Sequence, residues 1–295
     1  MSDPVAKTKA KILVQLDADP QPSVFDGVVA VDAGVDHLFR HGQVTPDQVT
    51  GLVHGALFTR GPADLRSSAI FVGGSDLARA EALLEAVRAS FFGPFRVSVL
   101  LDPNGANTTA AAAVLAAIKA TGGVEGRRIA VMGATGPVGG RVARLLVGLG
   151  AIVAVGSRDR ARSEALATRL ASSREGAKIS AFSTGSPEMV GEGLAGASVA
   201  ISAGAAGAMI LPRAVRQGLT DLEAVIDLNA VPPLGIEGIE PNDRGVDRDG
   251  NKAWGALGIG QTKMKIHKAA IRALFESNDA VLDAEELLGL GRDLA

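Results

Sequence analysis

Short apolar runs alternate with amphipathic stretches along the first third of the chain. Nearly continuous apolar character over residues 11–17, 68–72 and 96–101 predicts buried strands. Apolar side chains at helical spacing predict helices over 46–57 and 76–91, the first of them with Thr45 as its N-cap. Strands that alternate with helices in this way predict a parallel sheet covered by helices.

The same alternation begins again after a predicted Ala-rich helix over 107–120, which ends at Thr121-Gly122-Gly123. Further strands are predicted over 128–132, 151–155, 178–182, 198–202 and 224–228. Further helices are predicted over 138–149, 160–172, 262–276 and 283–290. We therefore expect an α/β fold of two domains with a cleft between them, residues 1–122, completed by C-terminal helices within 262–295, and residues 123–261.

The composition of the chain excludes several classes of function and of catalytic residue. The 295 residues include 30 Lys plus Arg and 32 Asp plus Glu, and the resulting net charge of −2 argues against a nucleic-acid binder. The absence of Cys excludes a thiol nucleophile and a thiolate metal site, and the absence of Tyr excludes a Tyr–Lys dehydrogenase pair. The four His residues form no HExxH motif, so no metal site is expected.

No stretch of the sequence predicts a membrane span, because the most apolar runs are short and rich in Ala, Gly and Ser. The N-terminal residues lack the long apolar region of a signal peptide. We expect a cytoplasmic protein without a membrane or nucleic-acid partner.

The sharpest motif is the glycine-rich turn GATGPVG at 133–139, between a predicted strand and a predicted helix. Glycines at this place allow a tight turn and a close approach of a pyrophosphate, which the helix N-terminus then binds. A plain strand-to-helix turn would also account for glycines, but the context favours a dinucleotide site. The residues expected to contact the cofactor here are Gly133, Thr135, Gly136, Pro137, Val138 and Gly139.

The end of the next predicted strand indicates which dinucleotide is bound. NAD sites place an acid there, whereas this strand ends in Ser157 and Arg158 and is followed by Arg160 and Arg162. A guanidinium pairs with a 2′-phosphate through charge-assisted hydrogen bonds, so NADP is expected, although the adjacent Asp159 weakens the preference. Residues 123–261 are thus expected to form an NADP-binding Rossmann domain. Three residues at later strand ends are expected to complete the cofactor site: Ser202, Ala203 and Asn229.

The usual proton carriers of dehydrogenases are scarce in this chain, which favours a hydride transfer that needs no general base. Three polar or glycine-rich segments suit a ligand site, although each could also be a well-capped turn. They are residues 102–109, 227–235 and 255–263.

Taken together, the sequence resembles the NADP-dependent methylene-tetrahydromethanopterin/methylene-tetrahydrofolate dehydrogenases of methylotrophic bacteria over nearly its whole length. The resembling segments are 22–26, 44–47, 59–61, 69–74, 91–98, 107–112, 133–140, 229–236, 255–260 and 274–277. Two departures are Ala134-Thr135 in the glycine-rich turn and Asp159, where the family can carry a basic residue.

The resemblance implies removal of a hydride from the methylene carbon between two nitrogens, whose lone pairs stabilise the methenyl cation, so that positioning provides most of the catalysis. It also implies a homo-oligomer, a trimer, and Lys263 as the catalytic residue. The substrate-binding residues it implies are Asp17, Asp19, Asp26, Thr59, Arg60, Asn104, Thr108, Thr109, Pro232 and Gly258.

Two other functions fit the residues. A reductase similar to shikimate dehydrogenase shares two α/β domains, but its alcohol substrate requires a proton carrier, and no lysine before position 122 stands in a convincing catalytic position. A non-catalytic NADP sensor would bind NADP without turnover of a one-carbon pterin.

Overall fold

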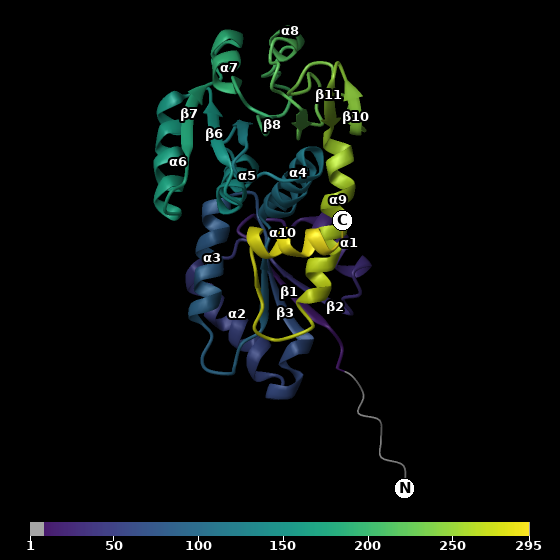
Figure 1. Ribbon diagram of the computed structural model, residues 1–295. Helices are drawn as coiled ribbons and strands as arrows, with labels where there is room; N and C mark the ends of the chain where they lie inside the picture. Colours follow the sequence, from purple (N-terminus) through teal and green to yellow (C-terminus); the bar gives the residue numbers. More distant parts are fainter. Residues whose placement is uncertain (1–8, 295) are drawn as a thin grey trace. The chain divides into compact units, whose positions relative to one another are not determined.

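The computed structural model describes residues 9–294, which divide into two compact units (Figure 1). Unit 1 comprises the chain up to Gly105 together with Ile266–Leu290. Unit 2 comprises Ala106–Lys265 with the residues after Leu290. None of the helices within 9–294 combines the length and apolar character that crossing a bilayer requires.

Unit 1 is built on a five-stranded parallel sheet with the strand order β12-β4-β3-β1-β2. Its strands are β1 (Ile12–Leu16), β2 (His37–His41), β3 (Ser68–Val72), β4 (Ser98–Leu101) and β12 (Val281–Leu282). Its helices are α1 (Val24–Asp32), α2 (Pro46–Phe58), α3 (Leu77–Ala89), the later part of α9 (Ala256–Ala273) and most of α10 (Ala284–Asp293), with 3-10 turns at Pro62–Ser67 and Pro103–Gly105.

Apolar packing explains why β3 and β4 form strands at the centre of this sheet, since every residue of both is buried. Val72 and Leu101 share a core with Leu57 of α2 and Leu83 of α3, and these two helices lie side by side (Figure 1). The three strands and two helices predicted before residue 102 are confirmed, as is the Thr45 N-cap of α2.

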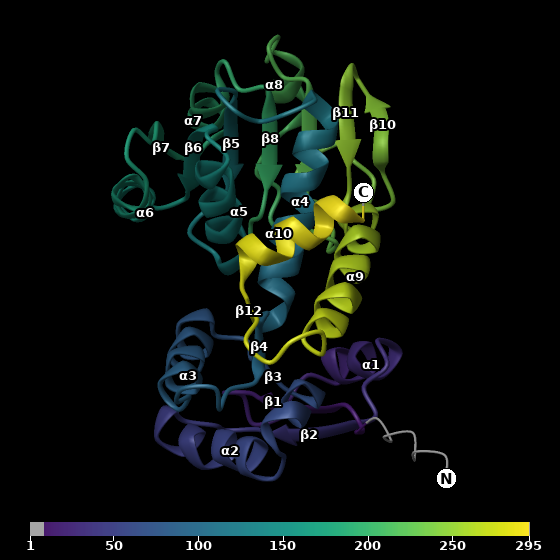
Figure 2. The same ribbon diagram turned by 60° about the horizontal axis from the view of Figure 1, so that its bottom comes forward.

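Unit 2 is built on a seven-stranded sheet with the order β10-β11-β9-β8-β5-β6-β7, parallel except for the β10–β11 hairpin (Figure 2). Its strands are β5 (Arg128–Met132), β6 (Ile152–Ser157), β7 (Ile179–Ser183), β8 (Val199–Ser202), β9 (Ala224–Asp227), β10 (Arg244–Arg248) and β11 (Asn251–Trp254). Its helices are α4 (Ala106–Thr121), α5 (Pro137–Gly148), α6 (Arg160–Ser173), α7 (Pro187–Leu194), α8 (Arg213–Gln217) and the start of α9.

The Ala-rich helix α4 packs against α5 and β9, and it therefore belongs to unit 2 by its contacts. The five strands predicted from residue 128 onward are confirmed, and with unit 1 they confirm the α/β fold class and the Rossmann-like second sheet. The domain limits 1–122 and 123–261, and the cleft between the domains, stay predictions.

One helix begins earlier than the sequence predicts. The sequence predicts a glycine-rich entry from residue 255 and a helix from residue 262, whereas α9 already begins at Ala256. Gly258 and Gly260 thus lie inside the helix, although glycine is a weak helix former. A Cβ on Gly258 would collide with the carbonyl oxygen of Asp243, so close packing explains the glycine at this position.

Candidate functional site

The glycine-rich turn connects the end of β5 to α5, where Gly136 is the N-cap and Pro137 the first helical residue. Gly133 has a φ of +71°, and a Cβ there would lie 2.7 Å from the carbonyl oxygen of Ala203. A Cβ on Gly139 would collide with the carbonyl oxygen of Gly133. The turn therefore packs against both its own helix and the end of β8, and glycine is required for that close approach.

A cavity of about 750 Å³ opens beside this turn, a volume in the range of small-molecule sites. Eight of the residues expected at a cofactor line it: Gly133, Thr135, Gly136, Pro137, Ser157, Arg158, Arg162 and Ala203. The lining also includes residues that the sequence motifs do not assign to the site: Asp159, Thr184, Gly204, Ala205, Ala208, Met209 and Ile210. Thr184 directly follows β7, a strand that the sequence predicts over 178–182, and its place near a strand end is a signal for a ligand site.

The start of α5 supplies positive potential to this cavity. The first backbone N–H groups of a helix have no partner within it, and Gly136 has no side chain to cap them. Val138 and Gly139 lie in this first turn, so their contribution is expected from backbone N–H groups. The aligned peptide dipoles add to the attraction for an anion.

At the end of β6, two of the three arginines line the cavity and one does not. Arg158 and Arg162 are among the lining residues, whereas Arg160 donates to Glu164 one helical turn further on, at 2.9 Å. The hydroxyl of Thr135 contacts that of Ser157 at 3.2 Å. This rim of two guanidinium groups and two hydroxyls suits a phosphate monoester.

The carboxylate of Asp159 accepts hydrogen bonds from the backbone. The residue is the N-cap of α6, and its carboxylate accepts the N–H groups of Ala161 at 3.0 Å and Arg162 at 3.4 Å. A carboxylate at the N-terminus of a helix is stabilised by the helix dipole. The feature that weakened the NADP prediction therefore has a structural explanation.

Ser202 and Asn229 are buried and do not line the cavity. The segment 228–235, called the proline loop below because it contains Pro232 and Pro233, follows β9 and holds the Asn229 side chain internally. Asn229 accepts the N–H of Val231 at 2.9 Å and donates to the carbonyl of Pro233 at 3.2 Å. A cofactor contact from either side chain stays a prediction, as does a substrate contact from the exposed Pro232.

In unit 1, hydrogen bonds of Asp17 and Asp19 connect the loops that follow β1 and β3 at the carboxyl edge of the sheet. Asp17 directly follows β1 and accepts the N–H of Asp19 at 2.9 Å. Asp19 accepts from the N–H and the hydroxyl of Ser75, after β3, at 2.8 Å and 3.0 Å. Burial raises the pKa of Asp17, and the neighbouring charge of Asp19 adds to the rise.

Asn104 lies at the same edge, in the turn after β4, with a φ of +51°. Thr59 and Arg60 follow α2 and lie at the opposite, amino edge, where Arg60 donates to the carbonyl of Ala10 at 2.8 Å and Thr59 to that of Gly55 at 3.0 Å. The structure therefore does not bring these two residues together with Asp17 and Asn104.

The remaining predicted substrate residues lie on helices. Asp26 is buried in the first turn of α1. Thr108 is buried and Thr109 half-buried in the first turns of α4. Lys263 is half-buried on α9. Their roles toward a substrate stay predictions.

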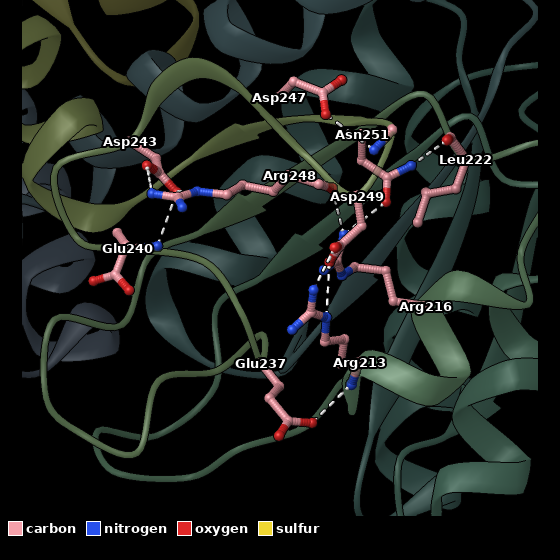
Figure 3. A network of polar contacts seen from close by, with 11 residues as sticks. Arg213, Arg216, Leu222, Glu237, Glu240, Asp243, Asp247, Arg248, Asp249 and Asn251 are labelled. Atoms are coloured by element: carbon pink, nitrogen blue, oxygen red, sulfur yellow. Dashed lines mark hydrogen bonds and ion pairs between the residues drawn. The ribbon is translucent and has the colours of Figure 1, made fainter.

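A polar network at the other end of unit 2 is structural (Figure 3). Asp249, in the β10–β11 turn, pairs with Arg213 and with the fully buried Arg216, and the two arginines hold the pKa of Asp249 below its usual range. Arg248 reaches back along β10 to Asp243 with two hydrogen bonds of 2.9 Å and 2.7 Å. The Asp249 end lies at the amino edge of the sheet, opposite to the cavity.

The fold and the cavity define a two-unit α/β protein of the dinucleotide-binding class. A family model described as methylene-tetrahydromethanopterin dehydrogenase, N-terminal, matches residues 24–104. The chain is 47% identical over 286 residues to the bifunctional protein MdtA of Methylorubrum extorquens, covering 97% of this chain and 99% of that protein. The chain belongs to the methylene-tetrahydromethanopterin dehydrogenase family, which confirms the resemblance seen in the sequence.

A second relative from the same organism, an NAD(P)-dependent methylenetetrahydromethanopterin dehydrogenase, is 31% identical over 282 residues, covering 92% of this chain and 95% of that protein. Among solved structures, shikimate 5-dehydrogenase from Listeria monocytogenes superposes with a TM-score of 0.56 over 100% of this chain and 99% of that one. Its sequence identity is 13%, so the likeness shows a shared fold and carries no statement about the substrate.

Proposed function

We propose that the protein is an NADP-dependent dehydrogenase that oxidises the methylene group of methylene-tetrahydromethanopterin, methylene-tetrahydrofolate or both to the methenyl form. The observation that carries the proposal is the cavity rim at the end of β6, where Arg158 and Arg162 line the cavity while Asp159 caps α6. The membership of the family supports the substrate class.

Different residues of the chain would bind different parts of NADP. Arg158 and Arg162 would hold the 2′-phosphate, and the Ser157 and Thr135 hydroxyls could add hydrogen bonds to it. The first N–H groups of α5 bind the pyrophosphate. When bound, NADP supplies the hydride acceptor.

Hydride removal from a carbon between two nitrogens leaves a cation that both lone pairs stabilise, so no proton moves at the reacting carbon. The chain needs to orient the substrate and exclude water, and a protein without Tyr or Cys suits this reaction. Lys263 is proposed to fix the pterin by hydrogen bonding. The polar residues at the carboxyl edge of unit 1, Asp17, Asp19 and Asn104, are proposed to bind pterin N–H groups.

We further propose that the protein acts in the cytoplasm as a homo-oligomer, a trimer by its family resemblance. Sedimentation of the purified protein tests the oligomeric state, and a monomer at assay concentration would contradict it.

An anaerobic absorbance assay of NADPH formation tests the activity. Purified protein receives methylene-tetrahydrofolate or methylene-tetrahydromethanopterin, each with NADP or NAD. Turnover with NADP supports the proposal, and the ratio of the two pterins assigns the carrier. Tight NADP binding without turnover of either pterin would contradict it and would favour a sensor.

A pair of lysine variants tests the role of Lys263. Lys263→Ala is expected to lower kcat/KM by about 10- to 100-fold, the scale of one lost charge-assisted hydrogen bond. Lys265→Ala, on the same helix but exposed, is the matched control and is expected to keep its activity.

A further inference from the structure

Asp227 ends β9 with a carboxylate that is 1% exposed and does not line the cavity. One of its oxygens, Oδ1, accepts the backbone N–H of Asn229 at 3.0 Å. The other, Oδ2, accepts the N–H of Ile236 at 2.9 Å. The two bonds hold both ends of the proline loop to the end of the same strand.

The N–H groups of Asn229 and Ile236 bind different oxygens of Asp227, so both oxygens of this side chain act as acceptors. An ionised carboxylate is acceptor-only on both atoms, whereas an amide offers one acceptor and one donor. Asparagine at position 227 would set an NH₂ group against one of the two N–H donors. Burial disfavours the charged form and raises the pKa of Asp227, while the hydrogen bonds from Asn229 and Ile236 oppose that rise.

The proline loop is joined to the wall of the cavity. The carbonyl of Gly235, at the end of the loop, accepts the N–H of Ile210 at 2.9 Å and that of Leu211 at 3.1 Å. Ile210 belongs to the segment 203–210, which contributes six residues to the lining. Asp227 therefore acts on this wall through Ile236 and Gly235.

Strand order indicates which half of a dinucleotide meets this wall. The glycine-rich turn follows β5, and the phosphate-binding arginines follow β6 on one side of it. β8 lies on the other side of β5 (Figure 2), and β9 is the next strand beyond it. A dinucleotide that crosses the carboxyl edge with its 2′-phosphate at β6 places its nicotinamide half at the 203–210 wall.

We propose that Asp227 is a positioning residue for the nicotinamide half of NADP: its buried carboxylate fixes the proline loop and, through it, the 203–210 wall of the cavity. The inference rests on the proposed dehydrogenase function and goes beyond it by assigning a positioning role to a buried carboxylate that does not line the cavity.

Asp227→Asn tests the proposal with two probes. The first is 2′,5′-ADP, which represents the adenosine half, and its dissociation constant is measured by calorimetry. The second is NADPH, whose nicotinamide fluorescence reports the environment of the other half. Asp221→Asn, which removes an exposed carboxylate before the same strand, is the matched control.

The variant is expected to bind 2′,5′-ADP within about twofold of the wild type. Its NADPH dissociation constant is expected to rise about tenfold, with loss of the bound fluorescence signal and a fall in kcat of at least about tenfold, the scale of one lost hydrogen bond to a charged group. Unchanged NADPH binding and kcat would overturn the proposal. An equal loss of 2′,5′-ADP and NADPH binding would also overturn it, because Asp227 would then support the whole unit.

Asp227→Glu provides a second variant if Asp227→Asn does not fold. It keeps two acceptor oxygens but lengthens the side chain by one methylene, which displaces them from the N–H groups of Asn229 and Ile236, so the same split between the probes is expected. Failure of the wild type to bind 2′,5′-ADP would contradict NADP binding itself, and so it is distinguishable from a failure of this inference.

Discussion

Asp159 and Arg162 are joined by a hydrogen bond from the backbone N–H of the arginine to the carboxylate of the aspartate, 3.4 Å long, in the first turn of α6. This bond occupies the carboxylate of Asp159 and also fixes the backbone of Arg162, which lines the cavity. The acidic and the basic residue after β6 therefore have separate tasks, the first in starting the helix and the second at the cavity.

Cofactor selectivity is the first prediction. Arg158→Ala is expected to raise the KM for NADP about 10- to 100-fold and to leave the kinetics with NAD nearly unchanged, because a guanidinium–phosphate pair contributes about 1.5–3 kcal/mol. Steady-state assays with both dinucleotides measure this change. Arg160→Ala is the control, since Arg160 pairs with Glu164, and an equal effect of the two substitutions would contradict the assignment of the phosphate site.

The capping role of Asp159 leads to a stability prediction. Asp159→Ala is expected to lower the free energy of unfolding by about 1 kcal/mol, the usual contribution of an N-cap. Asp159→Asn keeps a good capping side chain and is expected to stay near the wild type. Denaturant unfolding measures both. Equal stability of all three proteins would show that the cap contributes nothing.

Two glycines of α5 form a matched pair for testing the turn. Gly139→Ala is expected to lower the stability by about 2–4 kcal/mol and to abolish dinucleotide binding, because its methyl group would collide with the Gly133 carbonyl.

Gly148→Ala makes the same chemical change at the exposed end of that helix, where nothing lies within 4 Å. It is expected to raise the stability by about 0.5–1 kcal/mol through helix propensity. Thermal unfolding with and without NADP measures the stability and the cofactor binding of both variants. If Gly139→Ala kept the stability and NADP binding of the wild type, the turn would be able to relax around the added methyl group.

The buried carboxylate of Asp227 predicts a pH dependence of stability. Burial raises its pKa, so the folded state holds the proton more tightly than the unfolded chain does. This contribution is fully present below about pH 4, the ordinary aspartate range, and is lost as the pH rises through the raised pKa.

Unfolding of the wild type and of Asp227→Asn at several pH values checks this sign. The wild-type stability minus that of the variant is expected to fall as the pH rises from about 4 toward neutrality. A difference that increases with pH would show that the carboxylate is stabilised in its charged form. Asp17 titrates in the same direction in both proteins, and its contribution cancels in the difference.

Most of the fold could be predicted because its central strands are continuous apolar runs with capped helices between them. Several elements that the sequence did not predict break this pattern. α1 exposes Val24, Val28 and Val31, so its apolar residues do not mark a buried face. β2 and β10 carry polar or charged residues and are largely exposed, which conceals the period of a strand.

The glycine-rich turn and the two arginines could be predicted because spacing alone places them at the ends of neighbouring strands. The role of Asp227 could not, since its importance lies in contacts with Asn229 and Ile236 rather than in any motif. Arg160 and Arg162 look equivalent in the sequence, and only the helix geometry separates the one that pairs with Glu164 from the one that lines the cavity.

Strand β12 pairs with β4, across more than half of the chain, and Ser98 accepts the N–H of Ala280 at 3.3 Å beside that pairing. A ribosome therefore completes all residues of the seven-stranded sheet before it releases the edge strand that the first sheet requires. During translation, β4 of unit 1 has no neighbouring strand on one side until β12 has been synthesised. All strands of unit 2 have been synthesised by then. Completion of the first sheet therefore depends on residues that are synthesised after every strand of the second sheet.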